Sequence, residues 1–126
     1  MRKIFTLTFL LFGTQLSADA IMQQCKDKWG NDYRMIKYCV DHQRSAKRKV
    51  SSLKKDEIYH HCVGKWNDDY RMVDYCAKQQ RTAKSIVLSY RNDDIKQMCA
   101  RKWGKDYVMV KYCIDSQRKA KRALGM

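Results

Sequence analysis

Six cysteines occur in three pairs of equal spacing, and these pairs are the residues whose chemistry is easiest to interpret. Their thiols could bind a metal or form disulfides. The C-x-x-C pairs and the C…H-x-x-x-H arrangement that are typical of zinc sites do not occur in the sequence. An even number of cysteines allows complete pairing, so we predict disulfides and no metal site. The pairs are Cys25 and Cys39, Cys62 and Cys76, and Cys99 and Cys113.

Each cysteine pair belongs to a longer pattern that occurs three times at intervals of 37 residues. The copies are CKDKWGNDYRMIKYC from Cys25, CVGKWNDDYRMVDYC from Cys62 and CARKWGKDYVMVKYC from Cys99. Self-similarity at a fixed period is typical of arrays of supersecondary units. The prediction is therefore a single domain over residues 21–126 that contains three repeats, residues 21–55, 56–92 and 93–126.

Each repeat is predicted to contain two helices joined by a sharp turn. Asp56 and Asp93, with Asp19 at the matching position of the first copy, are placed to cap the first helix. The triplets Gly-Asn-Asp, Asn-Asp-Asp and Gly-Lys-Asp then combine a helix stop with the cap of a second, longer helix. Pro is absent and only 5 Gly occur, which also favours helices. The predicted fold class is all-α: three helical hairpins.

Helix geometry bears on how the cysteines pair. In one continuous helix, two cysteines 14 residues apart would lie ~21 Å apart, whereas a disulfide needs Cα atoms within about 7 Å. Across two antiparallel helices, facing Cα atoms lie ~5.4 Å apart. We therefore predict that each repeat is clipped by one disulfide of its own. The alternative is a continuous helix with disulfides between repeats or between chains.

The other recurring residues are interpreted mainly as structural. Trp29, Tyr33, Met35 and Tyr38 recur at helical spacing, which favours packing between helices and against the next repeat. Each copy has one glutamine on the otherwise apolar stripe of its second helix. We expect these glutamines to satisfy backbone groups between repeats, and a ligand contact is the alternative. They are Gln43, Gln80 and Gln117.

The N-terminal residues predict export. Met1-Arg2-Lys3 is followed by an apolar run from Ile4 to Gly13 and by Ala18-Asp19-Ala20, which matches an A-x-A cleavage site. Residues 1–20 are therefore predicted to be a secretory signal peptide, cleaved after Ala20 or, as the alternative, after Ala18. The mature chain is expected to have no transmembrane segment and to be periplasmic or extracellular, where cysteines form disulfides.

No residue pattern predicts catalysis. The sequence contains no Ser-His-Asp pattern or Gly-rich phosphate loop, and His60-His61 has no counterpart in the other two copies. The repeated aspartates are explained by helix capping. We therefore expect a protein that is not an enzyme and that uses no cofactor.

Positive charge is the property that packing explains least. The chain carries a net charge of +14, and loss of residues 1–20 would remove two cations and one anion, which leaves +13. Acid-free basic segments extend the second helices of the first and third repeats. Such segments favour an acidic or polyanionic partner. Their predicted partner-binding residues are Arg44, Lys47, Arg48, Lys49, Lys54 and Lys55 in the first segment and Arg118, Lys119, Lys121 and Arg122 in the second.

The run K-W-x-x-D-Y-x-M-x-x-Y-C-x-x-x-Q, from Lys65 to Gln80, resembles a segment of small uncharacterised bacterial exported proteins. The resemblance implies a helical segment and a bacterial origin, and it implies no activity. The arrangement is also loosely similar to Sel1-like repeats, whose Gly/Ala pattern and shorter cysteine spacing are missing here, so their roles are not carried over.

The function expected from the sequence is a secreted or periplasmic basic binding module that engages an acidic protein or an anionic envelope component. One alternative is a general polyanion or membrane-surface binder, either antimicrobial or nucleic-acid binding. A second alternative is an enzyme inhibitor or immunity-type protein. Salt separates the first two, because purely electrostatic binding weakens steeply as salt rises.

Overall fold

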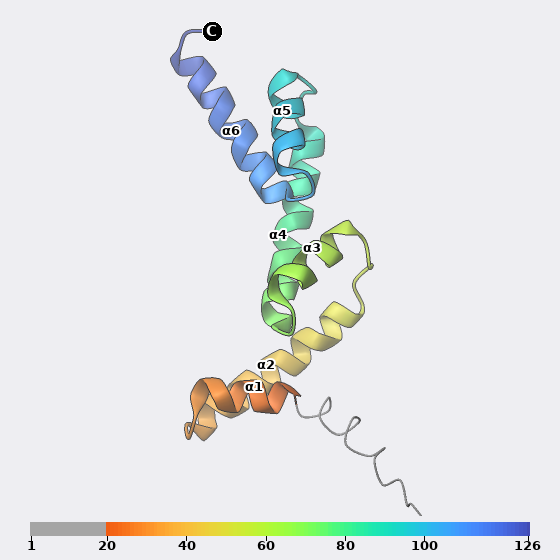
Figure 1. Cartoon of the computed structure of the whole chain (residues 1–126), viewed down its shortest axis with the longest axis vertical. Helices are drawn as coiled ribbons and strands as arrows, with labels where there is room; N and C mark the ends of the chain where they lie inside the picture. The colour runs from red at the N-terminus through yellow and green to blue at the C-terminus, as the bar shows by residue number, and fades with distance from the viewer. Residues whose placement is uncertain (1–19) are drawn as a thin grey trace, which may run out of the picture. The chain divides into compact units, whose positions relative to one another are not determined.

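The computed structural model describes residues 20–126, which form six helices and no β-strand (Figure 1). The all-α prediction is confirmed for this part of the chain. The predicted signal peptide and the Asp19 cap lie outside the described residues, except for Ala20, which begins the first helix. The helices are α1 (Ala20–Trp29), α2 (Tyr33–Ser51), α3 (Glu57–Trp66), α4 (Tyr70–Ser89), α5 (Asp94–Trp103) and α6 (Tyr107–Ala123).

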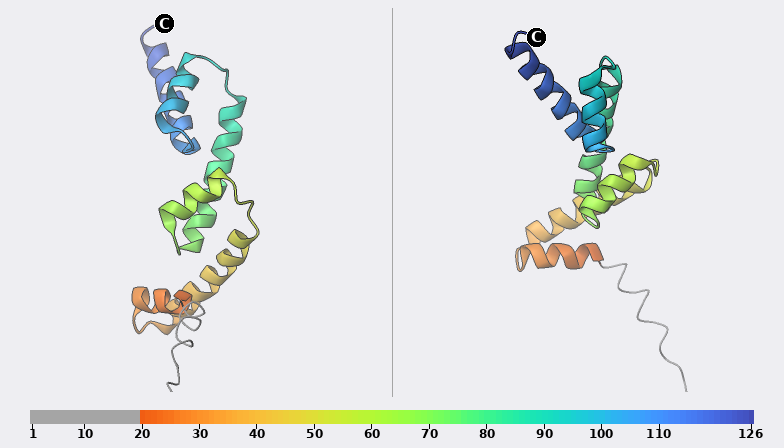
Figure 2. Two further views of the ribbon diagram at one scale, coloured as in Figure 1. Left: turned by 45° about the vertical axis from the view of Figure 1, so that its right-hand side comes forward. Right: turned by 45° about the horizontal axis from the view of Figure 1, so that its top comes forward.

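Each short helix lies beside the first part of the long helix that follows it (Figures 1 and 2). We call these pairs hairpin 1 (α1 and α2), hairpin 2 (α3 and α4) and hairpin 3 (α5 and α6). The contacts divide the chain into two compact units at Ser45, so that the last turns of α2 belong to the same unit as hairpins 2 and 3. Within this second unit α4 contacts both α3 and α6.

The turn inside each hairpin has the predicted chemistry. Gly30, Asn67 and Gly104 end the short helices with positive φ angles of 58°, 49° and 54°. Glycine tolerates this left-handed backbone best, and asparagine is the residue that most often replaces it. Two residues later an aspartate caps the long helix: Asp69 Oδ1, for example, accepts a hydrogen bond from the backbone N–H of Met72 at 3.3 Å.

All three predicted disulfides are present, and the alternative of pairing between copies is wrong for this structure. Cys25–Cys39, Cys62–Cys76 and Cys99–Cys113 each join Cα atoms 5.7 Å apart, close to the distance expected across two packed helices. The first cysteine of each pair is fully buried. Each disulfide therefore lies within its hairpin's packing rather than at its surface.

The second unit contains two apolar clusters, each completed by a residue from the long helix before it. Val50 of α2 packs with Ile58 and Val73 of hairpin 2. Val87 of α4 packs with Val110 and Ile114 of hairpin 3. A hairpin in this unit is thus covered by the end of the preceding long helix.

The prediction that the recurring aromatic residues are packed is wrong for several tyrosines. Tyr33 is 77% exposed, and Tyr38 and its counterparts Tyr75 and Tyr112 are also exposed. Tyr38 lies off the buried stripe of Ile36, Cys39, Val40 and Gln43, which explains its exposure. Trp29 and Met35 are half-buried. Tyr70 and Tyr107, the counterparts of Tyr33, are half-buried because a preceding long helix covers them.

We predict that removing one disulfide weakens its hairpin substantially. In Cys62→Ala/Cys76→Ala the unfolded chain regains the freedom of a loop of about 15 residues, so the free energy of unfolding should fall by about 3 kcal/mol. Urea denaturation followed by circular dichroism measures the change. Mass spectrometry should show the other two disulfides intact. A loss below about 0.5 kcal/mol would contradict the importance assigned to the cross-link.

Candidate binding surfaces

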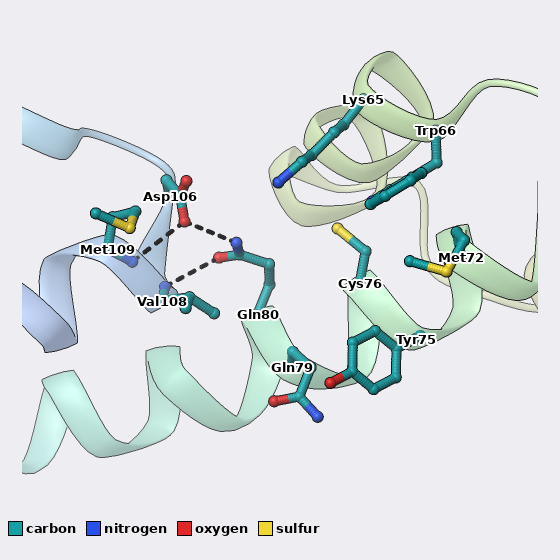
Figure 3. Close-up of a pocket in the computed structure, with 10 residues that line it drawn as sticks. All are labelled: Lys65, Trp66, Met72, Tyr75, Cys76, Gln79, Gln80, Asp106, Val108 and Met109. Carbon is teal, nitrogen blue, oxygen red and sulfur yellow. Dashed lines mark hydrogen bonds between the residues drawn. The ribbon is translucent and has the colours of Figure 1, made fainter.

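Gln80 of α4 links hairpins 2 and 3 through a buried amide. Its Oε1 accepts hydrogen bonds from the backbone N–H groups of Tyr107 and Val108 at 2.7 and 3.3 Å, and its Nε2 donates to Asp106 Oδ1 at 2.8 Å. Figure 3 shows this amide facing the start of α6. The amide satisfies N–H groups that a helix start leaves without intrahelical partners. The prediction that these glutamines serve backbone groups is confirmed for Gln80 and wrong for Gln117, whose side chain is exposed.

A second polar cluster joins hairpin 2 to hairpin 3 beside this amide. The Tyr107 hydroxyl donates a hydrogen bond to Glu57 Oε1, and Lys84 Nζ lies 3.1 Å from the same oxygen. The hydrogen bond from Tyr107, followed by that from Lys84, lowers the pKa of Glu57. The same bond to Glu57 raises the pKa of Tyr107. A carboxylate held ionised in this way is suited to a structural ion pair and unsuited to general-acid chemistry.

Two arginines hold the capping aspartates of the short helices. Arg81 pairs with Asp56 at 2.9 Å, and Arg118 pairs with Asp93 at 3.1 Å. Arg118 also donates to the carbonyl oxygen of Arg91. Arg118 was predicted to bind a partner, and the structure places it half-buried with its charge already paired.

The other nine predicted partner-binding residues are exposed. They form no ion pair with any residue in the 20–126 range, although Lys47 Nζ lies 5.7 Å from the ring centroid of Tyr70. Their charge is therefore free to act on an anion. They are Arg44, Lys47, Arg48, Lys49, Lys54, Lys55, Lys119, Lys121 and Arg122.

A groove between hairpins 2 and 3, drawn in Figure 3, has a volume of about 260 Å³. Trp66, Met72 and Met109 supply apolar surface, and Tyr75 and Val108 are exposed beside it. Lys65 Nζ lies 5.7 Å from the Trp66 ring centroid. The Gln80 amide and the Asp106 carboxylate, which also line the groove, are hydrogen-bonded to each other, so the groove offers mainly apolar contact, the Gln79 amide and one ammonium group. It suits an apolar side chain that has a carboxylate nearby.

The sequence did not predict the groove, because the recurring Trp, Tyr and Met residues that line it were interpreted as core residues. The signal that could have revealed it is the position of Tyr75, which lies off the stripe formed by Val73, Cys76, Ala77 and Gln80. An aromatic residue that recurs off the buried face of a helix is placed to be exposed.

Within residues 20–126 no group of three or more His, Cys, Asp or Glu side chains is arranged to hold a metal ion. None of the described helices combines the length and apolar character needed to cross a membrane.

Comparison with known proteins adds no assignment. No family model matches the chain, and no curated protein or solved structure matches it. The resemblance to small bacterial exported proteins therefore stays a prediction.

We predict that Gln80→Leu destabilises the protein by about 1–3 kcal/mol, because the N–H groups of Tyr107 and Val108 and the Asp106 carboxylate lose their partner. The matched control is Gln117→Leu, at the same position of hairpin 3, where the side chain is exposed and forms no such bonds. Its expected effect lies within about 0.5 kcal/mol. Thermal denaturation of both variants checks the difference, and equal losses would contradict the role of Gln80.

Acid should destabilise the fold through its capping carboxylates. The N–H of Tyr59, and then Arg81, lower the pKa of Asp56, and the N–H of Lys96 with the nearby Arg118 lowers that of Asp93. A carboxyl whose folded pKa is lowered stabilises the fold above its unfolded pKa, and this stability is lost as pH falls below about 4. Denaturant midpoints measured between neutral pH and about pH 2 should show the loss.

Asp56→Asn should reduce this acid sensitivity, since the amide does not titrate. Asp68→Asn is the control, because Asp68 is exposed and forms no ion pair with a described residue. An unchanged acid profile in Asp56→Asn would contradict the assignment.

Proposed function

We propose that this chain is an exported binding module for an acidic protein or an anionic component of the cell envelope. The observation that carries the proposal is the set of nine exposed cations that form no ion pair with a described carboxylate. Elsewhere in the described chain, cations such as Arg81, Lys84 and Arg118 are paired with carboxylates. A surface with this much unpaired charge attracts acidic partners over distances of about a Debye length.

The groove beside Lys65 favours a protein partner over a partner recognised by charge alone. Buried apolar anchors supply most of the binding energy at protein interfaces, while charges at the rim mainly speed association. Trp66, Met72 and Met109 offer such an apolar surface next to a positive charge. A partner segment that carries an aromatic or aliphatic residue beside Asp or Glu would fit both features.

Two further points support this proposal. Three disulfides suggest an oxidising environment outside the cytoplasm. The three hairpins are proposed to be copies of one 37-residue repeat, since caps, turns and disulfides recur at that interval. Arrays of this kind commonly present extended binding surfaces. The carboxylates of Asp56 and Glu57 are occupied in ion pairs, which supports binding rather than catalysis.

The unpaired cations by themselves also favour a second function, a general polyanion or membrane-surface binder. The first function uses the groove to bind an apolar anchor of the partner, whereas a purely electrostatic binder does not need the groove. They therefore differ in how binding responds to salt and to changes in the groove.

We predict that a protein partner captured from an envelope extract stays bound when salt is raised from about 0.1 M to about 1 M. The bait is the oxidised protein recovered after export, and the bound material is identified by mass spectrometry. Tyr75→Asp should reduce capture of that partner at high salt by 10-fold or more, on the order of 1.4 kcal/mol of binding energy. Release of only nucleic acid, lipid or mixed acidic material by salt would favour the polyanion binder.

Two matched pairs of variants serve as controls for this experiment. Lys54→Glu/Lys55→Glu should slow capture at low salt, whereas Arg101→Glu/Lys105→Glu makes the same charge change at exposed residues outside the predicted set. Tyr112→Asp repeats the groove substitution in hairpin 3, where Tyr112 is exposed. Binding at a specific surface would be contradicted if the two charge-reversal variants reduced capture equally. Equal effects of Tyr75→Asp and Tyr112→Asp would contradict it as well.

A further inference from the structure

Hairpin 3 is built to receive the end of the long helix that precedes it. Val87 near the end of α4 packs with Val110 and Ile114. One turn earlier, Lys84 Nζ lies 5.3 Å from the ring centroid of Tyr107. Three contacts therefore define the junction between the end of α4 and hairpin 3. They are Val87 in the apolar cluster, Lys84 over the Tyr107 ring and the Gln80 amide at the start of α6.

Two of these contacts, the apolar one and the lysine over a tyrosine ring, occur one period earlier, at the end of α2. Val50 packs with Val73 and Ala77 of hairpin 2, and Lys47 Nζ lies 5.7 Å from the ring centroid of Tyr70. The junction is thus a recurring mode of association between a long-helix end and a hairpin.

The end of α6 carries the same residue types, and nothing in the described chain receives them. Leu124 matches Val50 and Val87 and is 75% exposed, whereas both valines are buried. Ala120 is also exposed, although its counterparts Ala46 and Ala83 are buried. We call this free end the donor end: Gln117, Ala120, Lys121 and Leu124.

Hairpin 1 carries the complementary surface, and no described residue fills it. A hollow of about 340 Å³ is lined by Tyr33, Ile36, Val40 and Arg44, among others, and Ile36 and Val40 at its base are only 7% and 4% exposed. Tyr33 is 77% exposed, whereas its counterparts lie under Lys47 and Lys84. We call this hollow the acceptor end.

The corresponding place in hairpin 3 shows what such a hollow receives. Arg118, the counterpart of Arg44, lies 5.1 Å from the ring centroid of Tyr90, and the Tyr90 hydroxyl donates to Asp115 at 2.7 Å. Tyr90 follows directly after α4. The occupant of this place in hairpin 3 is therefore the end of a long helix from the preceding hairpin.

We propose that copies of this chain associate head to tail, with the donor end of one copy in the acceptor end of the next. Leu124 would pack on Ile36 and Val40, Lys121 would lie over the Tyr33 ring, and Gln117 would bind the start of α2. The two surfaces differ, so each contact is heterologous and leaves one donor end and one acceptor end free. Association therefore continues beyond a dimer and depends on concentration.

Salt distinguishes this association from the proposed binding of an acidic partner. Residues 21–55 and 93–126 each carry an excess of Lys and Arg, ten against three acids and nine against four. Two positively charged ends repel each other, and salt screens that repulsion. Self-association should strengthen as salt rises, whereas polyanion binding weakens.

The test uses two variants that each disable one end at an exposed residue: Tyr33→Asp at the acceptor end and Leu124→Asp at the donor end. The oxidised protein recovered after export is examined by sedimentation equilibrium up to about 1 mM, a concentration that detects weak contacts. Wild type should form species larger than a dimer. Each variant alone should be monomeric, and their equimolar mixture should form a 1:1 dimer that grows no further.

Leu88→Asp is the matched control, because Leu88 on α4 is 68% exposed and belongs to neither the donor end nor the acceptor end. It should associate like wild type, and circular dichroism should confirm that all three variants are folded. The proposal is overturned if wild type stays monomeric at high salt. It is also overturned if either end variant still dimerises alone, or if mixing the two variants yields no dimer.

Discussion

A helix of ten residues has too few internal hydrogen bonds to be stable alone in water, and α1, α3 and α5 each have ten. Each of these helices depends on the disulfide that holds it against a longer partner. The cross-link requires the chain to reverse within the residues between its cysteines, which explains the left-handed residue at Gly30, Asn67 and Gly104. The capping aspartate then restarts the helix in the opposite direction. The aspartate caps, the left-handed turn residues and the buried stripe of each long helix are all consistent with the chain reversal that the disulfide requires.

The long helices extend this local arrangement from one hairpin to the next. The first part of α4 carries Cys76 and Ala77 in the cluster of hairpin 2, while Val87 belongs to the cluster of hairpin 3. Gln80 lies between the two and hydrogen-bonds to the start of α6. One helix thus serves two apolar clusters, and its polar middle residue sets the position of the second hairpin. An amide suits this place because it can donate to Asp106 and accept from backbone N–H groups at once.

Apart from the role of Gln80 between two hairpins, the features that sequence reasoning predicted are those determined within one copy of the pattern. Cysteine spacing, the turn triplets and the aspartate caps depend on neighbours close in the chain, and the structure confirms them. The exposure of Tyr33 was not predicted, because it depends on whether a preceding helix covers it, whereas the exposure of Tyr75 follows from its position off the buried stripe and was missed. The pairing of Arg118 with Asp93 was also missed, since basic residues near a helix end were interpreted by charge alone. The groove beside Lys65 requires two hairpins together, and one copy of the pattern contains only part of it.

The close spacing of the paired cysteines also affects how the protein matures. Each disulfide joins residues only 14 apart, whereas the nearest cysteine of the next pair lies 23 residues further along the chain. In the export proposed for this chain, its N-terminal side enters the oxidising compartment first, so Cys39 would pair with Cys25 before Cys62 arrives. Six cysteines allow 15 pairings in principle, but this order of arrival favours the native set. Because loop closure over short separations is fast, each hairpin can close as soon as its own two cysteines are exposed to an oxidant.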